Sequence, residues 1–178
     1  MASEYVGRSY ILENYEVLPA LIKVLNGEVA DTIMRQQALG TVQKLSLRRN
    51  AQEQMIDLDV IKWLVHVLSD ADSLSSYSLE YASALLMNLS LRSAGRARCA
   101  KTKILSVLTA LLENENPRVR TFINGALYSV LSLNPIREQA NVEGLGDFLK
   151  ILIQNSEPNF QDQLRFILDK LNSDEDEV

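Results

Sequence analysis

A short motif recurs along this chain of 178 residues and sets the period of any fold it can adopt. Segment 45–48 reads Leu-Ser-Leu-Arg, segment 89–92 repeats it, and segment 131–133 carries a degenerate Leu-Ser-Leu copy. The spacing of about 43 residues lies within the range of helical solenoid repeats. In such folds each unit buries its apolar side against its neighbours and leaves a long surface for partners. The period therefore favours a binding protein over an enzyme.

Two helical patterns follow this period. In the first, apolar residues are spaced by three, three and one, which is typical of one face of an α-helix; its four copies begin at Leu18, Ile61, Leu105 and Leu145. The second consists of the triplets Ala38/Val42/Leu45, Ala82/Leu86/Leu89 and Asn124/Tyr128/Leu131. A small residue recurs within it, at Gly40, Ala84 and Ala126. We expect these small residues to let neighbouring helices approach closely.

Each unit also has room for a short additional helix, around 51–56, 94–100 and 135–141. Three helices per unit are typical of armadillo repeats, whereas HEAT repeats have two. All four prolines fall at expected helix starts, where proline is best tolerated: Pro19, Pro117, Pro135 and Pro158. The sequence thus predicts an all-α, armadillo-type right-handed superhelical solenoid of about four repeats.

The patterns also suggest boundaries. We expect repeats at about 17–58, 59–101, 102–141 and 142–172, and an acidic disordered tail over 173–178. Residues 1–16 read as a helix of a preceding, incomplete repeat. Solenoids normally end in a polar face, whereas Tyr10, Ile11 and Tyr15 are apolar or aromatic. We therefore expect that the chain comes from a longer protein that continues N-terminally.

Composition excludes several classes of protein. Four of the 23 acidic residues lie in segment 174–177, and the remaining 19 nearly balance 18 lysines and arginines. A nucleic-acid-binding protein would be more basic, although segment 92–103 holds five basic residues and no acid. No apolar stretch approaches the roughly 20 residues of a membrane span. The single cysteine excludes an internal disulfide, and we expect the chain to be monomeric.

No catalytic constellation is present, so we expect neither an enzyme nor a bound cofactor or metal. His66 is the only histidine, and we expect it to be structural or on the surface. Basic neighbours would lower the pKa of Cys99, yet no motif marks it as a nucleophile. Trp63 stands beside a core position of its repeat, where packing between repeats is the favoured role.

The last helix of each unit lines the concave face of such a solenoid. By the register above, the candidate partner-binding residues on it are Lys44, Arg48, Asn88, Arg92, Leu127 and Val130. The recurring motif would be the buried end of this helix, with its arginine directed outward. The resulting surface is basic at one end and apolar at the other, which suits an acidic or amphipathic helix. A merely solvated charged face explains the same residues equally well.

Three segments carry a family resemblance. Residues 35–46, 78–90 and 124–129 resemble the armadillo region of the armadillo repeat-containing protein nine family, which are LisH-domain-containing ciliary proteins, and the resemblance extends over about 5–171. It implies a non-enzymatic scaffold, cytoplasmic at the centriole, basal body and cilium, that supports cilium assembly and stability and Hedgehog signalling. It also implies a TOG-array microtubule-binding partner and a link to Joubert syndrome.

Two alternatives stay open. A peptide-receptor armadillo module for transport or adhesion would carry a ladder of asparagines, but only Asn88 occupies that position, with Lys44 and Val130 in the neighbouring units. A tubulin-binding helical-repeat module would place tryptophan on a loop, whereas Trp63 falls in an expected helix. Both are less favoured than the ciliary scaffold.

Overall fold

The computed structural model describes residues 1–173, which form twelve α-helices and one short 3-10 helix. The first helices are α1 (Tyr5–Glu13), α2 (Val17–Gly27) and α3 (Ile33–Leu45). A second group comprises α4 (Arg49–Asp57), α5 (Val60–Leu68), η1 (Ala71–Ser73) and α6 (Ser76–Ser90). The rest are α7 (Ser93–Cys99), α8 (Ile104–Ala110), α9 (Pro117–Val130), α10 (Asn134–Val142), α11 (Leu145–Asn155) and α12 (Pro158–Leu171). With α1 counted as the short helix of the first unit, the helices form four successive three-helix units.

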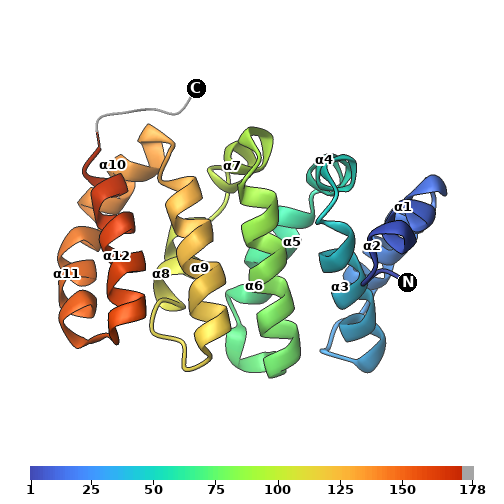
Figure 1. Ribbon diagram of the computed structural model, residues 1–178, viewed down its shortest axis with the longest axis horizontal. Helices are drawn as coiled ribbons and strands as arrows, with labels where there is room; N and C mark the ends of the chain where they lie inside the picture. The colour runs from blue at the N-terminus through green and yellow to red at the C-terminus, as the bar shows by residue number, and fades with distance from the viewer. Residues whose placement is uncertain (174–178) are drawn as a thin grey trace.

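The units stack along one axis, with α1 and α12 at opposite ends of the row (Figure 1). Helices α3, α6, α9 and α12 lie side by side and form one surface, which we call the third-helix face. Helices α5 and α8 lie behind this row, and α4, α7 and α10 follow its upper edge in Figure 1. The described chain is thus the predicted all-α armadillo solenoid.

Local sequence sets the start of three of the four third helices. The side chains of Thr32, Ser75 and Asn116 accept hydrogen bonds from backbone N–H groups in the first turns of α3, α6 and α9. Such caps satisfy donors that have no partner within the helix. The turns into two of the second helices contain a residue in the left-handed region: Asp59 and Gly144 adopt positive φ angles of 56° and 76° just before α5 and α11. Glycine adopts such angles without steric cost, and aspartate is one of the few other residues that occasionally does so. These residues allow tight turns between α4 and α5 and between α10 and α11.

One continuous apolar core runs through all four units. The predicted apolar stripe faces it almost throughout, but Ile151 is 56% exposed on α11, so its predicted core position is wrong. Trp63 packs partly buried against this core and lies 5.2 Å from the guanidinium carbon of Arg35, on the preceding unit. This contact confirms that Trp63 packs between repeats.

Polar contacts also join the first unit to the second. Asp31, in the loop before α3, accepts hydrogen bonds from the backbone N–H of Ser75 at 2.8 Å and from the Ser78 hydroxyl at 2.6 Å. Both donors belong to the N-terminal turn of α6, so one carboxylate of the first unit holds the N-terminus of the third helix in the second unit. The position of α6 relative to α3 therefore depends on a charged group as well as on apolar packing.

Two remaining expectations concern the ends of the chain and the membrane. Residues 174–178 of the predicted acidic tail lie outside the described residues. Over the described range, no helix has the length and apolar character needed to cross a bilayer.

Candidate protein-binding face

Small residues on the third-helix face make room for side chains of the neighbouring unit. A Cβ atom at Gly40 would collide with the hydroxyl oxygen of Tyr77, which reaches across from α6. A Cβ atom at Gly125 would lie 2.8 Å from the sulfur of Met87, also on α6. The predicted packing role of Gly40 is confirmed. In the third unit Gly125 makes this room for Met87, and the neighbouring Ala126 is fully buried in the core.

The register of the third unit is shifted by one residue from the predicted one. Arg48, Arg92 and Leu133 are the equivalent residues that directly precede α4, α7 and α10. The predicted register, in which Leu45, Leu89 and Leu131 correspond, would place Asn134 there instead of Leu133. One residue turns an α-helix by about 100°. Leu127 and Val130 therefore face the core with 0% exposure. Their prediction as outward, partner-contacting residues is wrong.

Asn88 is also turned away from solvent. Its side chain is only 8% exposed, and its amide nitrogen donates a hydrogen bond to the Ser46 hydroxyl oxygen at 2.8 Å. Ser46 is fully buried on the preceding unit. The predicted outward position of Asn88 is wrong, because this amide joins two repeats.

The recurring motif has a different exposure from the expected one. Its first leucine and its serine are buried, but its second leucine is 54% exposed at Leu47 and 56% exposed at Leu91. The motif is therefore only half buried, since its end already belongs to the turn into the next unit.

The three predicted basic residues are half-buried. Lys44 lies in the last turn of α3, whereas Arg48 and Arg92 lie beyond the ends of α3 and α6, at the turns into α4 and α7. The Arg48 guanidinium carbon is 4.2 Å from the ring centre of Tyr5. Arg48 thus already packs on α1, and these arginines border the end of the third-helix face rather than its middle.

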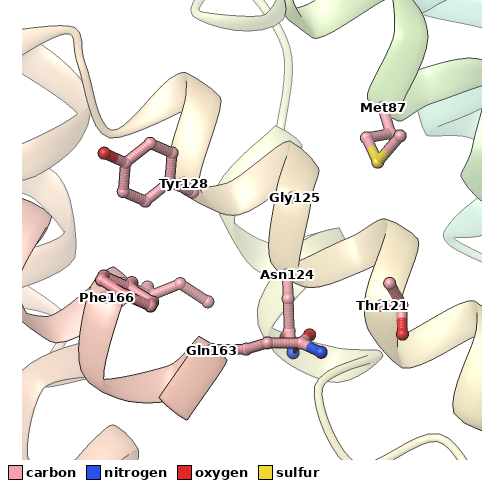
Figure 2. Close-up of a pocket in the computed structure, with 8 residues that line it drawn as sticks. Met87, Thr121, Asn124, Gly125, Tyr128, Gln163 and Phe166 are labelled. Carbon is pink, nitrogen blue, oxygen red and sulfur yellow. Dashed lines mark hydrogen bonds between the residues drawn. The ribbon is translucent and has the colours of Figure 1, made fainter. Parts of the chain in front are cut away.

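The C-terminal half of this face holds an open cleft between α9 and α12, with a volume of about 440 Å³. We call it the α9–α12 cleft; its lining residues are Met87, Thr121, Asn124, Gly125, Tyr128, Gln163, Phe166 and Ile167. Figure 2 shows Tyr128 from α9 and Phe166 from α12 on the same side of the cleft. Phe166 is 65% exposed and Tyr128 is 40% exposed. These large apolar surfaces are available to a partner.

A buried amide supplies the polar part of the cleft. Asn124 is only 4% exposed, and its amide nitrogen donates to the side-chain oxygen of Gln163 at 2.9 Å (Figure 2). Its own side-chain oxygen has no hydrogen-bond partner among the described residues. A buried acceptor left unpaired costs about 1–3 kcal/mol. A ligand that donates an N–H or O–H there would recover that cost.

The sequence did contain a signal for this cleft. The predicted register places Tyr128 and Asn124 at the positions of Val42 and Ala38 in the first unit, both of which are buried. A tyrosine and an asparagine in two apolar positions of one helix indicate a shifted register, in which both side chains turn toward the face. The sequence pattern predicts no outward position for Phe166 or Gln163, on the last helix.

Other reactive groups do not form a site. Cys99 is fully buried, and burial raises the pKa of its thiol to about 12, so the expected lowering by basic neighbours is wrong. His66 is exposed on α5. The described part of the chain has no group of three histidine, cysteine, aspartate or glutamate residues arranged to hold a metal ion.

Sequence comparison relates the whole described fold to one group of proteins. A family profile described as LisH domain-containing protein ARMC9, ARM repeats, matches residues 55–172. The human LisH domain-containing protein ARMC9 is 47% identical over 176 residues, which cover 98% of this chain and 22% of that protein. The mouse protein is 45% identical over 98% of this chain and 22% of its own length. For the cattle protein the identity is 44%, over 98% and 26%. The chain spans about a fifth to a quarter of these relatives.

Structural comparison agrees on the fold. An engineered protein of known crystal structure superposes with a TM-score of 0.79 at 16% identity, over 96% of this chain and 68% of its own. A designed armadillo repeat protein in complex with the peptide (KR)4 gives a TM-score of 0.78 at 19% identity, over 96% and 71%. At these identities the likeness concerns the armadillo architecture alone.

Proposed function

Because this chain belongs to the family of LisH domain-containing protein ARMC9, we propose that it is a non-enzymatic protein-interaction scaffold of the ciliary base. The armadillo-repeat fold supports a role in protein binding. Our proposal for the whole protein is a cytoplasmic location at the centriole, basal body and cilium, where it supports cilium assembly and stability and Hedgehog signalling. Loss of that role would connect the protein to Joubert syndrome.

The α9–α12 cleft is the observation that carries the binding proposal. It combines exposed aromatic side chains, Phe166 and Tyr128, with the buried and unpaired acceptor of Asn124. A few large apolar residues usually dominate the energy of a protein interface, and a buried polar partner adds specificity. An amphipathic helix with an apolar side chain and a neighbouring donor fits both requirements. The peptide bound to the designed armadillo neighbour supports the idea that this architecture can hold a partner segment.

We propose a TOG-array microtubule-binding ciliary protein as the partner, and its binding can be measured by biolayer interferometry with fragments of that protein. Phe166→Ala should weaken binding by about 2 kcal/mol, roughly 30-fold, if Phe166 is a central contact. Ile151→Ala is the matched control, because Ile151 is also apolar and exposed but lies on α11. Equal affinities for wild type and Phe166→Ala would refute the placement of the partner in the cleft.

A peptide-receptor module is the less favoured alternative, because the amide of Asn88 is already occupied by Ser46 and cannot clamp an extended peptide. Direct tubulin binding is also less favoured, since Trp63 packs within the fold rather than on a loop. Co-sedimentation with microtubules, with and without the TOG-array protein, separates direct tubulin binding from the scaffold role. Sedimentation of the isolated chain with microtubules would favour the tubulin-binding alternative.

A further inference from the structure

A second cleft lies on the side of the solenoid formed by α5 and α8, which are behind α6 and α9 in Figure 1. We call it the basic cleft; it is defined by Lys62 and His66 on α5, Lys101 and Lys103 before α8, and the apolar floor of Val65 and Val107. Its volume is about 410 Å³. It shares no lining residue with the α9–α12 cleft, so its occupant is a separate question.

The fold brings together charges that are distant in the sequence. Lys62 and His66 are four residues apart on α5 and therefore share one side of that helix. Lys101 and Lys103 belong to the turn between α7 and α8, two helices that both contact α5. Three lysines thus line one depression at the junction of the second and third units.

These charges are not neutralised within the fold. No aspartate or glutamate lines the basic cleft, and Lys62, Lys101 and Lys103 make no ion pair within residues 1–173. The acid on the turn before α5, Asp59, is already paired with Arg98. A cluster of three unpaired cations at the mouth of a cleft concentrates anions there.

The floor of the cleft narrows the chemistry of the anion. Val65 and Val107 are 7% and 5% exposed and form an apolar base below the lysines. A bare phosphate would leave this base unused, whereas a peptide can place carboxylates on the lysines and an apolar side chain on the valines. The chain as a whole carries a net charge of −5, which disfavours a nucleic acid. We propose that the basic cleft binds an acidic segment of a protein partner that carries an apolar residue between its carboxylates.

Fluorescence polarisation of the full chain tests this proposal. The probe is a fluorescein-labelled peptide of glutamates around one central leucine, and a second probe replaces the leucine with serine. The glutamate–leucine peptide should bind, should bind more weakly at high ionic strength, and should bind more tightly than the serine version. A wild-type chain that binds neither peptide would overturn the proposal, as would equal affinity for both.

Charge reversal locates the binding. The variant Lys62→Glu/Lys101→Glu/Lys103→Glu should weaken peptide binding by at least about tenfold. Each exposed ion pair contributes little binding free energy, but the three contributions add. The control Lys23→Glu/Arg49→Glu/Lys150→Glu changes the net charge by the same amount, but at positions elsewhere on the surface. Equal losses in the two variants would overturn the cleft as the site. If the first variant does not fold by circular dichroism, the milder Lys→Gln triple variant decides by the same criterion. Tighter binding of a short DNA duplex than of the peptide would also refute the proposal.

Discussion

Removal of the Asp31 carboxylate should loosen the junction between the first two repeats. In the wild type this group accepts one hydrogen bond from the Ser75 backbone N–H and one from the Ser78 hydroxyl, at 2.8 and 2.6 Å. Hydrogen bonds to charged groups contribute about 1.5–3 kcal/mol each. Ser78 is 1% exposed, so its hydroxyl would stay buried without this acceptor, whereas the N–H of Ser75 lies in a half-exposed turn and water can replace the acceptor.

We therefore expect Asp31→Ala to lower the free energy of unfolding by about 2–3 kcal/mol, nearer one full charged hydrogen bond than two. For a chain of this size, the melting temperature should fall by about 5–10 °C. Urea denaturation and thermal melting by circular dichroism measure the two quantities. The exposed Asp57, in the last turn of α4, is the control, and Asp57→Ala should change stability by less than about 0.5 kcal/mol.

A double-mutant cycle identifies the interaction itself. Asp31→Ala and Ser78→Ala should be coupled by about 1–2 kcal/mol, because each removes the same hydrogen bond. Additive effects of the two substitutions, or an unchanged denaturation midpoint for Asp31→Ala, would refute the idea that this carboxylate stabilises the contact between the first two repeats.

The same group predicts a dependence on pH. Burial acts to raise the pKa of Asp31, but the hydrogen bonds from Ser78 and Ser75 and the nearby charge of Arg35 outweigh it, so the pKa lies below its usual 3.8. A carboxylate whose pKa is lower in the folded state stabilises the fold above pH 3.8. That stabilisation is lost as the pH falls below 3.8 and through the folded-state pKa. As the pH is lowered from 5 to below 3.8, the free energy of unfolding should therefore fall more for the wild type than for Asp31→Ala.

Three further changes test other parts of the packing. Gly95→Ala should destabilise the chain by about 1–3 kcal/mol, because the new methyl group meets a backbone carbonyl at the end of α6; Gly27→Ala, where no atom lies within 4 Å, is the control in thermal melting. Ser46→Ala should cost about 1–3 kcal/mol in urea denaturation by leaving the buried amide of Asn88 unpaired, and a fully stable variant would contradict that hydrogen bond. The Cys99 thiol, buried and with a pKa of about 12, should resist a thiol reagent at pH 8 until denaturant is added; rapid labelling of the native chain would show that its helix opens.

The fold could be predicted from the sequence because many residues carry the same signal. Each unit repeats a stripe of apolar side chains, and an error at one position such as Ile151 leaves the helix and its partners unchanged. The helices α4, α7 and α10 were equally predictable, since 13 or 14 residues separate the third helix of one unit from the second helix of the next. A solenoid repeats these relations in every unit, so the assignment does not depend on any single residue.

The binding face could not be predicted in the same way, because a face depends on register rather than period. The capping residues Thr32 and Ser75 are 43 positions apart, but Ser75 and Asn116 are only 41 apart. The Leu-Ser-Leu copies shorten by the same two residues, from 44 to 42 positions. The residues that precede α4, α7 and α10, which are Arg48, Arg92 and Leu133, are 44 and then 41 positions apart, so the third copy lies one residue out of register. An α-helix turns a one-residue error into a rotation of about 100°, which exchanged the buried Leu127 for the exposed Tyr128.

The side chains that α6 extends to both neighbours have a mechanical consequence. Tyr77 rests over Gly40 of the first unit, and Met87 rests against Gly125 of the third. The second unit therefore grips the units on either side of it, whereas the terminal units are each held from one side. Under a stretching force on its two ends, such as an optical trap applies, the first and fourth units should unfold first. The second and third units, which Met87 and Gly125 join, should separate last. Met87 also lines the α9–α12 cleft. A ligand bound there would therefore contact the junction between the second and third units, which is the last to separate.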